Sequence, residues 1–174
     1  MLYKEYRYFY PPRPKNRAPK EAIIDYCNKR FLAQCKGNGS NLTLYTNGIV
    51  LYAMNRHGEP MTRISIPNKE LLSLCKNKGT WTVINGEYMN KAKKDSKGKL
   101  FNHKLIIFDI LVIDDTHLIG KSFSERIEIL DSLFIKCEFD DYIDQISENM
   151  FMFKSFDDSD DLVDMFEKLS IIDM

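Results

Sequence analysis

The sequence predicts an α+β fold, built mainly from antiparallel sheets flanked by helices. The strongest evidence is Asn47-Gly48, a pair typical of tight hairpin turns, which lies between the strand-like runs 42–45 and 49–52. A long β-branched run at 105–113 predicts a buried strand, and residues 122–125 (SFSE) match the capping box that opens a helix. With 174 residues, 44% of them hydrophobic, the chain is long enough to bury one core.

An extended arm and a helix are expected at the start of the chain. Residues 1–17 are rich in aromatic residues and proline, so we expect an arm there and the folded domain over residues 18–174. Pro19 suits the first turn of a helix, and apolar residues recur close to helical spacing as far as Phe31. Because no internal repeat or low-complexity linker is visible, we expect a single domain.

The middle of the chain is expected to hold a second helix and a further strand. Asn68 can cap a helix over residues 69–78, with Gly79 at its end. Residues 81–84 are typical of a strand, which we expect to continue through residues 85–89 into a lysine-rich loop.

Three elements are expected in the C-terminal part. The helix that begins at the capping box should turn Ile127, Leu130 and residues 133–134 toward the core. A short strand near 150–156 and an acidic amphipathic helix near 160–169 follow.

Charge is divided unevenly along the chain, although the formal net charge is zero. Residues 1–104 carry 20 Lys and Arg against 7 Asp and Glu, whereas residues 105–174 carry 5 against 18. The basic part includes a lysine cluster at 91–99, and such clusters are typical of surfaces that bind the phosphates of nucleic acid. Solvated loops without a partner would give the same pattern.

Neither a membrane span nor a metal or disulfide framework is indicated. The apolar runs within residues 105–113 are short and interrupted by aspartate, and the N-terminus lacks a hydrophobic signal core, so we expect a cytoplasmic protein with no membrane partner. The cysteines form no C-x-x-C pair, and there are only three histidines. Reduced thiols packed as small apolar groups are expected at all four cysteines, Cys27, Cys35, Cys75 and Cys137.

One short run carries the chemistry of interest, Lys36-Gly37-Asn38-Gly39-Ser40-Asn41, which lies between a strand-like segment and the hairpin. A lysine beside glycines can present its amine to a phosphate. The same string is also ordinary turn chemistry, because glycine and asparagine tolerate positive φ. The run therefore needs partners elsewhere in the chain before it indicates a function.

Three further patterns follow the run in order: Arg56-His57-Gly58, Gly86-Glu87 and Phe108-Asp109-Ile110-Leu111. Together, over roughly residues 10–130, they resemble the nucleotidyltransferase signatures of ATP-dependent polynucleotide ligases. The asparagine at position 41 makes the lysine run more similar to the K-x-(D/N/H)-G-(T/S)-N motif of RNA ligases than to the motif of typical DNA ligases. The resemblance implies the adenylation-domain fold.

The resemblance makes Lys36 the nucleophile. In this family the lysine attacks the α-phosphate of ATP, expels pyrophosphate and holds AMP through a phosphoramide bond. A lysine in that role must be partly deprotonated near neutral pH, which nearby positive charge, a metal or desolvation favours. The alternative is a surface lysine in a glycine turn.

The resemblance also implies five nucleotide contacts. Gln34 matches the position that reads the amino edge of adenine, Asn41 and Arg56 match ribose and phosphate contacts, and Phe108 matches an aromatic residue that stacks on adenine. Glu87 matches the acid that contacts the ribose or a metal-bound water, and this implies Mg²⁺ or Mn²⁺ shared with the ATP phosphates.

Each of these residues also has an ordinary structural explanation. Gln34 and Glu87 can be polar residues on open strands, and Arg56 can be a solvated hairpin end. Phe108, in so apolar a run, can be plain core. Arg126 matches nothing in the motifs and is expected to be a helix-surface residue.

Two later family signatures, a Glu-Gly-x-x-x-Lys strand and a Lys-x-Lys strand, are not found in the sequence. Their lysines would supply positive charge during phosphoryl transfer. We therefore expect the N-terminal part of an adenylation domain, apparently truncated at its C-terminal side and poorly active alone. A second polypeptide or a missing C-terminal segment would supply the rest.

The predicted function is that of an ATP-dependent RNA or DNA ligase, which joins a 5′-phosphate to a 3′-hydroxyl end of nucleic acid. A capping-type guanylyltransferase, which uses the same lysine chemistry with GTP, remains open as an alternative. A non-catalytic module that binds nucleotide or nucleic acid, and an unrelated α+β protein, also remain open.

Overall fold

The computed structural model describes residues 32–90, 98 and 100–157. The expected arm, the first helix, most of the lysine cluster and the acidic helix lie outside these residues. Within them, no helix is both long and apolar enough to cross a membrane.

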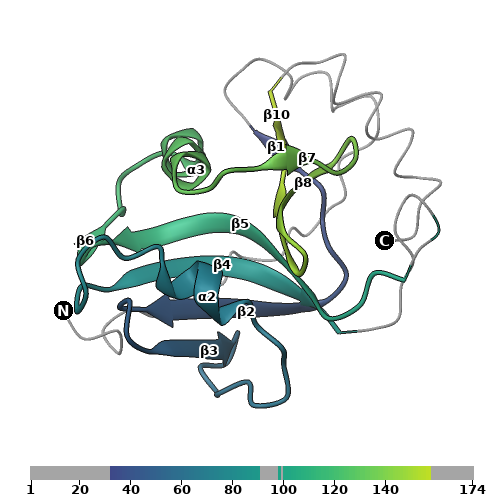
Figure 1. Ribbon diagram of the computed structural model, residues 1–174. Coiled ribbons are helices and arrows are strands. Elements are labelled where there is room, and N and C mark those ends of the chain that lie inside the picture. Colours follow the sequence, from purple (N-terminus) through teal and green to yellow (C-terminus); the bar gives the residue numbers. More distant parts are fainter. Residues whose placement is uncertain (1–31, 91–97, 99, 158–174) are drawn as a thin grey trace.

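A mainly antiparallel sheet forms the centre of the described fold, with its strands in the order β3-β2-β4-β5-β9-β8-β7 and β6 paired to β5 (Figure 1). Its strands are β2 (Ser40–Thr46), β3 (Leu51–Asn55), β4 (Thr82–Met89), β5 (Lys104–Ile113), β6 (Thr116–His117), β7 (Cys137–Glu138), β8 (Ile143–Ser147) and β9 (Met150–Phe153). All neighbouring strands run antiparallel except β5 and β9, which run parallel. The predicted sheet is therefore confirmed in outline, although β6, β7 and β8 were not expected.

One face of the sheet carries the main core and both described helices, α2 (Asn68–Leu72) and α3 (Phe123–Ser132). Side chains alternate between the two faces of a strand, so Ile84 and Tyr88 of β4 lie in this core. The core extends from Leu71 of α2 to Ile127 and Leu130 of α3. Both residues of α3 are buried, as the sequence predicts.

The opposite face of the sheet is mixed. Along β4, Val83 belongs to one apolar cluster and Met89 to another, while Asn85 and Glu87 lie between them. The residues that share this face on β2 include Asn41, which pairs in register with Glu87. A polar stretch thus interrupts the apolar surface here, and it holds two of the predicted site residues.

The hairpin forms where it was predicted, but its turn is longer. Strands β2 and β3 are joined by residues 47–50, and the expectation that the second strand begins at Ile49 is wrong. The side chain of Asn47 accepts hydrogen bonds from the backbone N–H groups of Ile49 and Val50, at 3.1 and 2.9 Å, and this satisfies them within the turn. Gly48 supplies the positive φ of 76°.

Helix α2 is shorter than the predicted helix over residues 69–78, and Asn68 does not cap it. Pro67 holds the N-cap position, without a side-chain cap bond. Packing ends the helix early, because the following turns bury Leu74 and Cys75 against the hairpin. There the Cys75 thiol donates to the Thr46 carbonyl at 3.5 Å.

The capping box of α3 is confirmed. The Ser122 hydroxyl accepts from the Glu125 N–H, and the Glu125 carboxylate accepts from the Ser122 N–H at 2.7 Å. The Ser122 N–H first, and then the Ser122 hydroxyl and the Lys121 amine, donate to this carboxylate and lower the pKa of Glu125 to about 2.

The predicted strand at 150–156 is divided at Lys154 into β9 and β10 (Ser155–Phe156). Strand β10 leaves the main sheet and pairs with β1 (Ala33–Gln34), directly before the lysine run. This two-stranded sheet fixes where the run begins. Cys35 and Cys75 are buried thiols, whereas Cys137 is exposed, so the expectation of a packed thiol is wrong at position 137.

Candidate functional site

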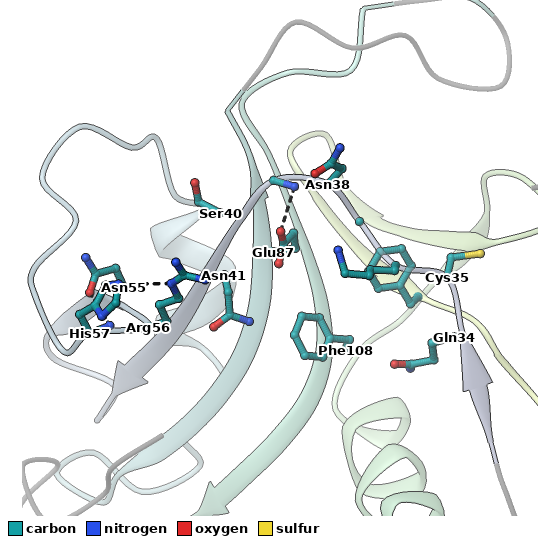
Figure 2. Close-up of a pocket in the computed structure, with 14 residues that line it drawn as sticks. Gln34, Cys35, Asn38, Ser40, Asn41, Asn55, Arg56, His57, Glu87 and Phe108 are labelled. Atoms are coloured by element: carbon teal, nitrogen blue, oxygen red, sulfur yellow. Dashed lines mark hydrogen bonds between the residues drawn. The ribbon is translucent and has the colours of Figure 1, made fainter. Parts of the chain in front are cut away.

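A cavity of about 860 Å³ opens between the lysine run, the turn after β3 and the strands β4, β5 and β9. Figure 2 shows Asn55, Arg56 and His57 on one side of it and Gln34 and Cys35 on the other, with Glu87 and Phe108 between them. The structure brings all six of the sequence-predicted site residues to its lining, namely Gln34, Lys36, Asn41, Arg56, Glu87 and Phe108.

The lysine run crosses the sheet close to β4, and its two glycines allow this approach. A Cβ at Gly39 would collide with the backbone carbonyl of Tyr88, and one at Gly37 would lie 3.2 Å from both Glu87 and Phe153. The Gly39 N–H donates to Glu87 Oε1 at 2.9 Å and ties the run to the strand (Figure 2). Lys36 is exposed at the cavity, where its amine is accessible to a ligand.

Glu87 is a half-buried carboxylate with charged and polar neighbours. Burial raises its pKa above the ordinary value, while the Gly39 N–H and the charge of Lys36 act in the opposite direction. One carboxylate oxygen accepts from Gly39, which leaves the other to face a ligand.

The Glu87 carboxylate fits a magnesium ion that is shared with a ligand's phosphates. Among the described residues, no group of three or more His, Cys, Asp or Glu side chains could hold a metal ion. Mg²⁺ commonly binds through one or two carboxylates plus substrate phosphates and waters, and Glu87 is a carboxylate that lines the cavity.

The orientation of Asn41 is determined by its neighbour on β4. Asn85 Oδ1 accepts from the Gly86 N–H at 3.0 Å and from Asn41 Nδ2 at 3.3 Å. A backbone N–H can only donate, so the Gly86 N–H fixes which end of the Asn85 carboxamide is the oxygen. Since that oxygen also contacts Asn41, the amide nitrogen of Asn41 must face Asn85. Within the described part of the chain, no donor reaches the buried Asn41 Oδ1.

Aromatic rings and an amide gather at the Gln34 side of the cavity. Phe108 is half-buried and lies 6.3 Å from the Phe153 ring, centroid to centroid, and both rings line the cavity. Gln34 Nε2 donates to Ser155 Oγ at 3.0 Å across the β1–β10 pair. Phe108 is thus available for stacking as well as contributing to the core.

Arg56 lies in a tight turn after β3. The side chain of Asn55 accepts from the His57 and Glu59 N–H groups, at 2.8 and 3.0 Å, and Gly58 has a φ of 77°. Arg56 is exposed, and its Nε donates to His57 Nε2 at 3.3 Å. The turn holds both basic side chains at the edge of the cavity (Figure 2).

Arg126 is not a simple surface residue, so that expectation is wrong. Its guanidinium donates to both carboxylate oxygens of Asp109, at 2.8 and 3.0 Å, and the two side chains are 22% and 15% exposed. Asp109 follows Phe108 at a bulge, where Asn85 pairs with Asp109 and Gly86 with Ile107. Helix α3 therefore anchors β5 next to the residue that enters the cavity.

Sequence reasoning gave no role to several residues of this region, among them Asn85, His57, Phe153 and Ser155. His57 belongs to the Arg56-His57-Gly58 pattern and Asn85 directly precedes Gly86-Glu87, so their proximity could have been inferred. Phe153 and Ser155 lie far along the chain in an apolar run that indicates only a strand. No local signal connects them to Gln34 or Phe108.

The sequence matches no family model and no curated protein. Among solved structures, it is similar to the ligase domain of M. tuberculosis LigD, with 18% identity and a TM-score of 0.40 over 57% of this chain and 35% of that chain. It is also similar to mycobacterial DNA ligase D complexed with ATP and MES, with 19% identity and a TM-score of 0.41 over 59% of this chain and 36% of that chain. The chain spans about a third of the length of these structures. Because a likeness of this extent does not transfer an activity, a functional assignment depends on the site itself.

Proposed function

We propose that the chain carries the nucleotide-binding part of an ATP-dependent polynucleotide ligase, with Lys36 as the residue that accepts AMP. One observation carries the proposal: residues of four separate motifs, chosen from the sequence alone, line a single cavity. The lysine run and Glu87 are also joined directly by the Gly39 hydrogen bond.

In the proposed first step, Lys36 Nζ attacks the α-phosphorus of ATP. A nitrogen–phosphorus bond forms, the bond to the β-phosphate oxygen breaks, pyrophosphate leaves and the amine loses its proton to solvent. Arg56, exposed at the cavity edge, provides a charged fork for phosphate oxygens. Asn41 lines the cavity as a contact for the ribose or phosphates, and Phe108 offers a ring for the base.

A magnesium ion held with the phosphates would neutralise charge that develops on the transferred group. Glu87 is the residue that would hold it, through the carboxylate oxygen that Gly39 does not occupy. The AMP would then pass to a 5′-phosphate end of RNA or DNA, and a 3′-hydroxyl end would displace it.

The test is the intact mass of the protein after incubation with ATP and Mg²⁺. We expect an increment of one adenylyl group, which Lys36→Ala abolishes and Lys76→Ala, at another exposed lysine, leaves unchanged. An increment with GTP alone would favour a guanylyltransferase. Nucleotide binding without any increment would favour a non-catalytic module. No binding at all would refute both enzymatic assignments.

We also propose that a further segment or a second polypeptide supplies the two lysine-bearing strands that the sequence lacks. In assays of this chain alone, we therefore expect formation of the lysine adduct without efficient strand sealing. Efficient sealing of nicked RNA or DNA by this chain alone would contradict this part of the proposal.

A further inference from the structure

The Gln34 side of the cavity has the features of a site for a purine base. Phe108 and Phe153 line the cavity, and aromatic rings bind the faces of bases by stacking. A carboxamide recognises the edge of a base, because it presents a hydrogen-bond acceptor and donors side by side. Gln34 is the carboxamide that lines this end of the cavity with the two rings, as Figure 2 shows for Gln34 and Phe108.

Gln34 is held by a residue outside the cavity lining. Ser155 is its cross-strand partner in the β1–β10 pair, and the Ser155 Oγ accepts from Gln34 Nε2 at 3.0 Å. Since the nitrogen faces Ser155, the carbonyl oxygen is the end of the carboxamide that is left to face a base. An oxygen in that place accepts from an exocyclic amine, as in adenine, and opposes the 6-oxo group of guanine or hypoxanthine.

We propose that Ser155 is a positioning residue for base recognition: it holds the Gln34 carboxamide so that the site prefers 6-amino purines to 6-oxo purines. The inference deepens the proposed function, because it assigns the preference for ATP over GTP to a particular pair of side chains. It requires only that a nucleotide occupies the cavity, and not that Lys36 reacts.

A serine hydroxyl both donates and accepts, so the orientation of Gln34 can be tested with side chains that do only one of these. Ser155→Ala removes the tether and lets the carboxamide turn over. Ser155→Thr keeps a hydroxyl. Ser155→Asp supplies an acceptor alone, which keeps the Gln34 nitrogen directed toward position 155.

The experiment measures equilibrium binding of AMP, IMP and GMP to the full chain and its variants. We expect wild-type protein to prefer AMP to IMP by roughly 10-fold, the value of about one well-placed hydrogen bond. Ser155→Ala should reduce that ratio to near one, while Ser155→Thr and Ser155→Asp keep it. Ser124→Ala, an exposed serine on α3, is the matched control and should keep the ratio too.

A purely structural role for Ser155 would weaken AMP and IMP binding equally and leave the ratio unchanged, which would overturn the inference. Gln34→Ala should abolish the preference, and adding Ser155→Ala to it should have no further effect on the ratio. Independent effects of the two substitutions on the ratio would also overturn the inference.

The outcome separates this inference from the proposed function. A Ser155-dependent preference for AMP without a lysine adduct would support the base site and refute the ligase chemistry. An adduct with ATP that forms without any Ser155-dependent preference for the base would support the ligase chemistry and refute the base site. Failure to bind any of the three nucleotides would refute both.

Discussion

The Gly39→Ala substitution tests whether the close packing of the lysine run on β4 is required. The backbone at Gly39 does not have a positive φ, so alanine is not excluded by conformation. Its Cβ would instead collide with the Tyr88 carbonyl, which belongs to the backbone of a central strand and cannot move aside. The run must therefore lift away from β4.

The size of the effect follows from that displacement. Restoring ordinary van der Waals contact requires a shift on the order of 1 Å. Such a shift would stretch the 2.9 Å bond from the Gly39 N–H to Glu87 Oε1 beyond hydrogen-bonding range. Overpacking costs about 1–3 kcal/mol and a bond to a charged acceptor about 1.5–3, while replacing glycine returns about 0.4–1. We expect a loss of about 3 kcal/mol in the free energy of unfolding.

Gly37→Ala in the same run is the matched control. There the added Cβ would lie 3.2 Å from atoms of the Glu87 and Phe153 side chains, which can adjust. We expect a change within about 1 kcal/mol. Urea denaturation of both variants measures the difference, and adduct formation with ATP should fall much more for Gly39→Ala. Equal destabilisation by the two substitutions, or wild-type stability of Gly39→Ala, would refute the reasoning.

Three further predictions concern the groups around the run. Burial raises the pKa of Glu87 above its ordinary value of 4.5, so the native state binds the proton of this carboxyl more tightly than the unfolded state does. The contribution of Glu87 to stability therefore falls as pH rises through the window above 4.5. Glu87→Gln should remove that decline in paired urea titrations, and it should abolish adduct formation. Arg126→Ala leaves the Asp109 carboxylate unpaired and should cost about 2 kcal/mol, and combining it with Asp109→Asn should cost less than the sum of the single changes. Asn85→Ala releases the Asn41 amide and should weaken ATP binding severalfold, whereas Asn85→Asp, which keeps the accepting oxygen, should weaken it less.

Features fixed by neighbouring residues could be predicted from the sequence. The capping box needs only Ser122 and Glu125, and the hairpin needs only the turn residues and two short strands, so both were found. Helix α2 was overestimated because its end depends on packing against the hairpin. Strands β6, β7 and β8 were missed because they are short and carry little apolar alternation.

The site divides in the same way. Lys36, Asn41 and Glu87 were predicted from short motifs, and their proximity follows from the pairing of β2 with β4, which places Asn41 opposite Glu87. The partner that holds Gln34 was not predictable, because Ser155 lies 121 positions away and becomes adjacent only when β10 pairs with β1. Site residues were thus recognisable individually, whereas the residues that orient them depend on tertiary contacts.

Arg126 illustrates how a residue that no sequence motif marks can orient a residue that a motif does mark. Its ion pair joins helix α3 to Asp109 of β5, next to Phe108, which the bulge leaves without a partner on β4. A residue that touches no ligand can therefore control where an aromatic ring lies in the site. Arg126→Ala should therefore weaken AMP binding as well as lower stability. Lys136→Ala removes an ion-pair partner of Asp131 on α3 and of Asp144 on β8, and it should lower stability alone.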